Sequence, residues 1–123
     1  MGAVIMNMTE LFRHETNVQA LPAGQTLFKE GDQGELMYVL MSGTAEISVR
    51  NRVVETAEAG AIFGEMAMID DGARSATVIA KSDCTLLPIE SERFNFLIQQ
   101  TPNFALYVMR VMAKRLRRAD DLL

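Results

Sequence analysis

Cysteine and histidine, which build many metal and redox sites, occur once each in this sequence, as Cys84 and His14. A single cysteine can form neither an internal disulfide nor the thiolate set of an iron–sulfur cluster. A chain without disulfides fits a reducing compartment. A single histidine cannot supply a cluster of imidazole ligands for a metal. We therefore expect no metal site and no cofactor, and we expect a cytoplasmic protein.

Long apolar runs and an excess of positive charge are also missing. No stretch approaches the ~18 to 20 apolar residues of a membrane span. The first dozen residues lack the basic start and the continuous apolar core of a secretory signal. The formal net charge is −4, which argues against a protein that binds nucleic acid. Neither a membrane nor a nucleic acid is an expected partner.

The sequence is rich in short apolar runs that are separated by turn residues. Its 123 residues are 49% hydrophobic, enough for one domain with a core. We predict strands at Thr16–Leu21, Gln25–Lys29, Glu35–Met41, Thr44–Arg50, Val53–Ala57, Ser75–Ala80 and Thr85–Ile89. Strands this short and regularly spaced favour a sandwich or barrel over an α/β sheet. The Ser42-Gly43 pair between two alternating runs predicts a hairpin there.

Helical patterns flank the strands at both ends. We predict a short helix within Asn7–Arg13, a helix that starts at Ser91, and a last helix over Pro102–Asp120, after the break at Thr101-Pro102. The last helix carries an apolar face and a basic cluster, the latter interpreted as a solvated face with cations near the helix end. The apolar face is Ala105, Val108, Met109, Met112 and Leu116, and the cluster is Arg110, Lys114, Arg115, Arg117 and Arg118. The predicted division is 1–15 as an N-terminal segment and 16–123 as one domain, with strands over 16–90 and helices over 91–120.

One stretch, Gly60–Val78, carries the chemistry of an anion site. Gly64 ends an apolar run and allows a close turn into a short helix, whose first N–H groups favour a negative charge. Arg74 offers a planar fork of donors that suits phosphate oxygens. Glu65 would repel an anion, unless it accepts a hydrogen bond from a hydroxyl group such as that of a sugar. The alternatives are an ordinary surface role for Arg74 and a helix-dipole role for Glu65.

The two halves of this stretch resemble the phosphate-binding cassette of the cyclic nucleotide-binding domain family. They are Phe63-Gly64-Glu65-Met66-Ala67 and Arg74-Ser75-Ala76-Thr77-Val78. The resemblance extends from about residue 21 to 116. It implies a mainly β fold with flanking α-helices: a double-stranded β-helix, or jelly roll, of about eight strands, with a short N-terminal helix and two C-terminal helices.

The resemblance also implies a role for each site residue. Arg74 pairs with the exocyclic phosphate oxygens, Glu65 holds the ribose 2′-hydroxyl, and Ser75 donates to the phosphate. The predicted ligand-binding set is Phe63, Gly64, Glu65, Met66, Ala67, Arg74, Ser75 and Ala76. Met112 and Leu116 on the last helix are predicted to cap the base. The expected ligand is cAMP in preference to cGMP.

The resulting hypothesis is a non-catalytic receptor in which ligand binding moves the C-terminal helix. The sequence shows no nucleophile–base pair and no second acid to accompany Glu65, so we do not expect an enzyme. We expect a stand-alone domain without a DNA-binding part, with a protein partner or a homodimer through the C-terminal helix. The alternatives are a regulatory domain excised from a larger transcription factor, kinase or channel, a ligand-free interaction scaffold, and a cupin-like isomerase, which the lone histidine disfavours.

Overall fold

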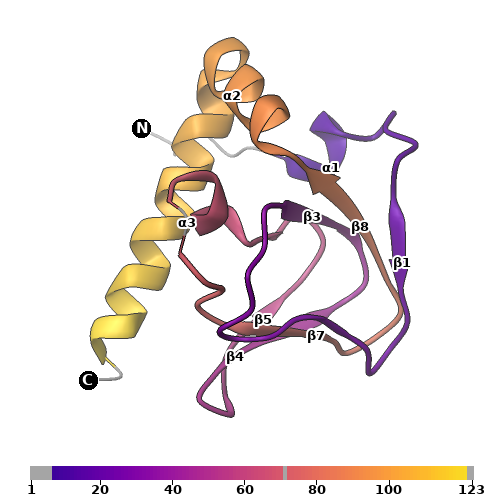
Figure 1. Ribbon diagram of the computed structural model, residues 1–123. Coiled ribbons are helices and arrows are strands. Elements are labelled where there is room, and N and C mark those ends of the chain that lie inside the picture. The colour runs from indigo at the N-terminus through magenta and orange to yellow at the C-terminus, as the bar shows by residue number, and fades with distance from the viewer. Residues whose placement is uncertain (1–6, 71, 122–123) are drawn as a thin grey trace, which may run out of the picture.

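The computed structural model describes residues 7–70 and 72–121, which form a β-roll with helices at its top and along one side (Figure 1). The helices are α1 (Met8–Leu11), α2 (Ser91–Gln100) and α3 (Pro102–Asp121), and η1 (Glu65–Met68) is a single 3-10 turn. The strands are β1 (Gln19–Leu21), β2 (Thr26–Phe28), β3 (Met37–Ser42), β4 (Ala45–Val49), β5 (Arg52–Ala57), β6 (Ile62–Phe63), β7 (Thr77–Ala80) and β8 (Cys84–Ile89). Within the described residues, eight strands with one short N-terminal helix and two C-terminal helices confirm the predicted architecture.

The strands form two antiparallel sheets, and the chain passes from one to the other at most connections. One sheet has the order β1-β8-β3-β6 and the other β2-β7-β4-β5. Strands β3 and β4 follow one another in the chain but belong to different sheets, so the hairpin predicted at Ser42-Gly43 is wrong. Gly43 has φ +95°, and a Cβ there would lie 2.4 Å from the carbonyl oxygen of Asp83. The glycine therefore carries the chain across the edge of the roll, against the β7–β8 turn.

Strands β4 and β5 pair as a hairpin. Its two-residue turn is Arg50-Asn51, and both residues have positive φ, 54° and 65°. Positive φ at both central positions is the geometry that matches the twist of two adjacent strands. The backbone N–H of Arg50 also donates to Glu30 Oε1 at 2.9 Å, which ties the turn to the β2 side of the roll.

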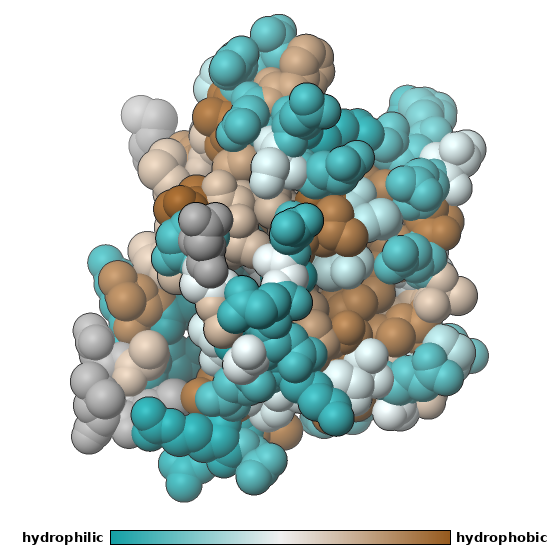
Figure 2. Space-filling view, viewed as in Figure 1, coloured by the Kyte–Doolittle hydropathy of each residue, from teal (hydrophilic) through white to brown (hydrophobic). Residues whose placement is uncertain are grey.

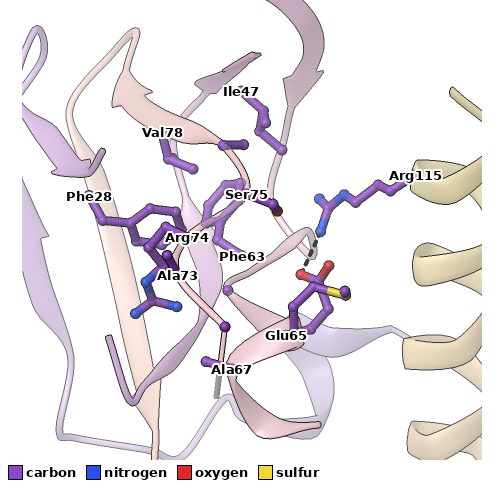
Figure 3. Close-up of a pocket in the computed structure, with 14 residues that line it drawn as sticks. Phe28, Ile47, Phe63, Glu65, Ala67, Ala73, Arg74, Ser75, Val78 and Arg115 are labelled. Carbon is purple, nitrogen blue, oxygen red and sulfur yellow. Dashed lines mark hydrogen bonds and ion pairs between the residues drawn. The ribbon is translucent and has the colours of Figure 1, made fainter. Parts of the chain in front are cut away.

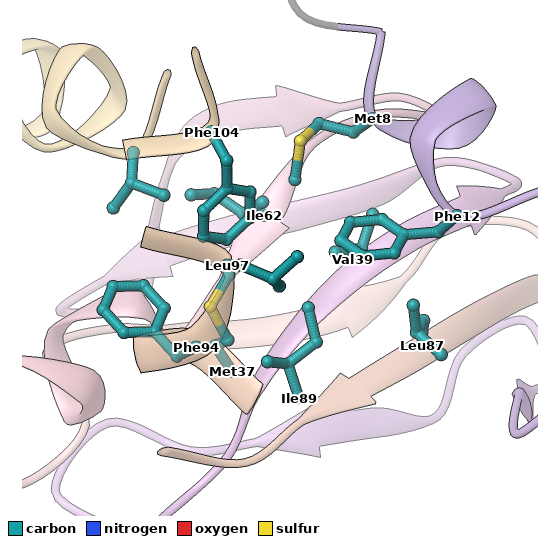
Figure 4. Packing of buried hydrophobic residues seen from close by; sticks show 11 residues of the cluster. Met8, Phe12, Met37, Val39, Ile62, Leu87, Ile89, Phe94, Leu97 and Phe104 are labelled. Carbon is teal, nitrogen blue, oxygen red and sulfur yellow. The ribbon is translucent and has the colours of Figure 1, made fainter. Parts of the chain in front are cut away.

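Two apolar clusters hold the molecule together, one inside the roll and one between the roll and the helices. The second cluster includes Phe104 of α3, whose ring meets Phe12 edge-on at 6.4 Å and Phe94 of α2 at 5.8 Å (Figure 4). Met8 of α1 is buried in the same cluster. Helices α1 and α3 thus share one core, and the boundary proposed at residue 16 stays a prediction.

The break between α2 and α3, together with one hydrogen bond from α3, sets the position of α3 along the roll. Thr101 lies outside the α region (φ −134°, ψ 83°), as expected before a proline, and Pro102 starts α3 without an N–H to satisfy. Tyr107 then donates its hydroxyl to the carbonyl of Gly60 at 2.7 Å. This contact sets α3 beside the loop that leads into β6 and η1.

The face of the molecule in Figure 2 is mostly hydrophilic, with apolar residues visible both beside α3 and on the opposite side, toward β1. Among the described residues, no helix combines the length and hydropathy needed to cross a membrane.

Candidate functional site

A pocket opens between η1, the segment before β7, and one side chain of α3 (Figure 3). All eight residues of the predicted ligand-binding set line it. The other lining residues are Phe28, Ile47, Gly72, Ala73, Val78 and Arg115. Its volume of about 50 Å³ is well below the ~300 Å³ at which ordinary small-molecule pockets begin. The structure therefore brings the predicted residues together around one narrow pocket.

Gly64 makes the turn from β6 into η1. Its φ is +75°, in the left-handed region that favours glycine. A Cβ at this position would lie 2.4 Å from Arg74 Nη1 and 2.9 Å from the carbonyl oxygen of Leu36. Gly64 is thus required for both the turn and the room that the guanidinium occupies.

Arg74 is a buried cation with two unpaired donors. It is 8% exposed, its Nη2 donates to the carbonyl of Leu36 at 2.8 Å, and its Cζ lies 4.2 Å from the ring centroid of Phe28. Within the described part of the chain, Nε and Nη1 are fully buried and have no hydrogen-bond partner. Buried polar groups are nearly always paired, and burial alone lowers the pKa of this guanidinium. The arrangement suits an anion that would accept from these two nitrogens.

The backbone on both sides holds Arg74 in place. Its N–H donates to Asp32 O at 2.7 Å, and its carbonyl accepts from the N–H of Gly31 at 2.8 Å. A Cβ on Gly34 would lie 2.3 to 2.5 Å from Nη2, Nε and Cζ of Arg74. Gly34 is therefore a second glycine that makes room for the guanidinium. No local pattern indicates this, because the two residues are 40 positions apart.

Glu65 lies at the opposite side of the pocket and is paired with α3. It is 4% exposed, and Arg115 Nη1 donates to its Oε1 at 2.7 Å (Figure 3). The same guanidinium donates through Nε and Nη2 to the two carboxylate oxygens of Glu55, each at 3.2 Å, and through Nη2 to Ile62 O at 2.8 Å. Burial opposes the charge on Arg115, but the two carboxylates outweigh it and raise its pKa. Arg115 thus joins β5, β6 and η1 to α3.

The interpretation of the basic cluster on α3 as a solvated face is therefore wrong for Arg115 and Arg118. Arg118 donates from Nη2 to Glu55 Oε1 at 2.7 Å and from Nη1 to Val54 O at 2.9 Å. Burial raises the pKa of Glu55, but the bonds and charges of the two arginines outweigh it, so the pKa lies below its ordinary value. Two residues of the cluster, Arg115 and Arg118, thus bind α3 to the roll.

The remaining predicted site residues differ in how far they are covered. Phe63 is buried in the pocket wall, Ser75 is exposed and Ala76 is half-buried. The N–H of Ala67 donates to Gly64 O at 3.2 Å, which closes the first turn of η1. Met66 lines the pocket and is 41% exposed, and Ile69 beyond it is 58% exposed.

The two residues predicted to cap a base lie away from the pocket lining. Leu116 is 67% exposed, and Met112 packs against the cluster between the roll and the helices. The α3 residue that does line the pocket is Arg115. The capping role of Met112 and Leu116 stays a prediction.

Comparison with known proteins agrees with this architecture. The family model "Cyclic nucleotide-binding domain" matches residues 18–101. The chain is 34% identical over 104 residues to the cyclic AMP receptor protein of Thermus thermophilus, which covers 80% of this chain and 48% of that protein. It is 39% identical over 72 residues to a cGMP-dependent protein kinase of Eimeria tenella, which covers 58% of this chain and 7% of the kinase. The chain therefore spans at most about half the length of these relatives.

A solved structure shares the fold. The crystal structure of the Thermus thermophilus catabolite activator protein superimposes with a TM-score of 0.73 at 32% identity, over 84% of this chain and 51% of that one.

Proposed function

Because this chain belongs to the cyclic nucleotide-binding domain family, we propose that it is a non-catalytic receptor for a cyclic nucleotide. The observation that carries the proposal is Arg74, a guanidinium that is 8% exposed and has two buried donors without a partner among the described residues. A cyclic phosphate placed against Nε and Nη1 would supply the acceptors. Each charge-assisted contact contributes about 1.5 to 3 kcal/mol.

The opposite side of the pocket suits the sugar of such a ligand. The Glu65 carboxylate accepts hydrogen bonds only, so it would accept from the ribose 2′-hydroxyl. Phe28, Ile47 and Val78 give the pocket apolar walls against which a purine can pack. Ser75, at the rim, would donate to the phosphate. We infer cAMP as the preferred ligand, and the likeness to a cyclic AMP receptor protein supports this choice.

The receptor would act through α3. The pocket is narrow and Arg115 of α3 lines one side of it, so a nucleotide bound there would act on the position of α3. A ligand that binds one arrangement better than the other shifts the population toward it. The movement of α3 is thus the proposed output.

Calorimetric titration with cAMP and cGMP tests the proposal. The protein is first freed of carried nucleotide by unfolding and refolding, and Arg74→Ala serves as the matched variant. We expect micromolar or tighter binding of cAMP by the unaltered protein, weaker binding of cGMP, and a loss of at least a hundredfold in the variant, since about 3 kcal/mol corresponds to that factor. Failure of the refolded protein to bind either nucleotide would overturn the receptor function and favour a scaffold.

Self-association through α3 is a second proposal, carried by a separate feature. Ala105, Met109, Met112 and Leu116 recur at spacings of four, three and four residues, the repeat that packs two helices together. Met109 and Leu116 are 58% and 67% exposed, although both are large and apolar. We expect a dimer in sedimentation equilibrium that Leu116→Glu converts to a monomer. A monomer before the substitution would contradict this.

A further inference from the structure

Met66 is the only methionine in the described part of the chain that both lines the pocket and is exposed to solvent. Met109 is also exposed, but it lies on α3 and is not part of the pocket lining. The described methionines that are buried or half-buried are Met8, Met37, Met41, Met68 and Met112. An oxidant dissolved in water can therefore reach a thioether at the ligand site without any opening of the core.

The two methionines of η1 have different surroundings, although they are only two residues apart. A 3-10 turn has three residues per turn, so Met66 and Met68 point in different directions. Met68 packs against the apolar cluster between the roll and the helices. The carbonyl of Met66 accepts from the N–H groups of Ile69 and Asp70, both at 3.0 Å, which fixes the backbone that carries the exposed thioether. Met68 is thus an internal reference for the reactivity of Met66.

Oxidation would change the surface that Met66 presents to a ligand. A thioether is apolar and polarisable and makes favourable contacts with aromatic rings, such as a purine. A sulfoxide is polar and carries an acceptor oxygen. The nearby walls formed by Phe28, Ile47 and Val78 offer this oxygen no side-chain donor. A nucleotide that covered the oxygen would bury it, which disfavours binding unless a donor is supplied.

We propose that Met66 is a site of reversible oxidation by hydrogen peroxide and that its sulfoxide weakens nucleotide binding. The second part rests on the proposed function. The thioether sulfur attacks one peroxide oxygen, the O–O bond breaks, and the proton of the attacked oxygen passes to the departing hydroxide. The products are methionine sulfoxide and water, and the two electrons that sulfur loses reduce the peroxide. Methionine sulfoxide reductases, with a thiol as the reductant, return the thioether.

The first test measures the modification itself in the nucleotide-free protein. Trypsin releases residues 53–74 as one peptide that contains both Met66 and Met68, and tandem mass spectrometry resolves the two sites. With dilute hydrogen peroxide we expect Met66 to oxidise about tenfold faster than Met68, because exposure sets the susceptibility. Equal rates at the two methionines would overturn the assignment of the site.

The second test measures the effect on binding by calorimetric titration with cAMP before and after peroxide treatment. We expect the affinity of the unaltered protein and of Met109→Leu to fall about tenfold, as for one polar group buried without a partner. Methionine sulfoxide reductases should restore it. Met66→Leu, compared with itself, should bind equally before and after treatment, since it keeps every other methionine. Met66→Gln, which places a polar side chain there permanently, should bind more weakly than Met66→Leu without any oxidant.

The outcomes separate this proposal from the proposed function. Unchanged affinity after complete conversion of Met66 would overturn the effect on binding, and so would an equal loss in Met66→Leu. Both results are compatible with a working receptor, which Arg74-dependent binding of cAMP reports separately. Absence of cAMP binding before any treatment would overturn the proposed function, and the effect on binding with it. The relative oxidation rates of Met66 and Met68 still decide whether Met66 is the modified site.

Discussion

Two arginines approach the same pocket from opposite sides, and they differ in how their charge is satisfied. Arg74 lies in the segment that precedes β7, with one hydrogen bond to Leu36 and two buried donors without a described partner. Arg115 comes from α3 and divides four hydrogen bonds among Glu55, Glu65 and Ile62. A buried cation with spare donors is poised for an anion, whereas a saturated one holds the structure together. The Arg74 side of the pocket is therefore suited to binding an anion, and the Arg115 side anchors α3 to the roll.

Substitution of each arginine by methionine should give opposite results in urea unfolding. Arg115→Met leaves Glu65 buried without its cation, which should lower the free energy of unfolding by about 3 to 5 kcal/mol. Arg74→Met removes a buried charge that lacks full pairing, so the free energy should stay within about 1 kcal/mol of the unaltered value. Equal destabilisation by both would abolish the distinction between the two arginines.

Gly34→Ala should disturb the Arg74 side without removing a donor. The new Cβ would lie within 2.5 Å of three guanidinium atoms, so the fork has to move. We expect cAMP affinity to fall about ten- to a hundredfold, as for the loss of one charge-assisted contact. The measurement is calorimetric titration, with Gln33→Ala in the same turn as the control. Unchanged affinity in Gly34→Ala would show that the guanidinium position is not critical.

Acid should weaken the contact between α3 and the roll. The pKa of Glu55 lies below its ordinary value of 4.5, so its pairing with the arginines stabilises the folded state above that pH. The stability is lost as the pH falls through the lowered pKa, because the unfolded chain takes up the proton first. Urea midpoints measured between pH 6 and 3 should therefore drop more steeply in the unaltered protein than in Glu55→Gln. Glu15, paired with Arg93, shifts in the same direction, and it contributes equally to both proteins.

Arg118→Met should have the smallest effect. Its pair with Glu55 is partly open to solvent, with side chains 31% and 25% exposed, and such pairs contribute about 0.2 to 1 kcal/mol. The measurement is the free energy of unfolding from urea titration. A loss much larger than this would mean that α3 is anchored mainly by Arg118, which would contradict the anchoring role given to Arg115.

The sequence predicts the pocket residues that lie in two short segments and misses the one that comes from α3. Phe63 to Ala67 and Arg74 to Ala76 lie close together in the chain, so a local pattern indicates a shared anion site. Arg115 follows Glu65 by 50 positions and sits among other basic residues on α3, so nothing local separates it from a solvated cation. Its role depends on the rotation of α3 against the roll, which the packing of Phe104 sets.

The error at Ser42-Gly43 has a related cause. Alternating apolar residues on both sides of a short turn predict two strands but do not tell whether they pair with one another. In this roll the Gly43 backbone passes between the sheets, and the partners of β3 come from β6 and β8. Pairing between segments that are far apart in the sequence depends on the tertiary structure, so local sequence patterns do not predict it.

The order of strands in the two sheets bears on how the chain reaches this structure. Strand β8 lies between β1 and β3, and β7 lies between β2 and β4, so each sheet receives an interior strand only after most of the roll has been synthesised. Until residues 77–89 are available, β1 and β2 have no partners and one edge of both β3 and β4 is open. Such non-local pairing makes folding slow, in the range of milliseconds to seconds, and open edges favour aggregation. Dilute, unhurried refolding is therefore the condition under which a nucleotide-free sample should be prepared.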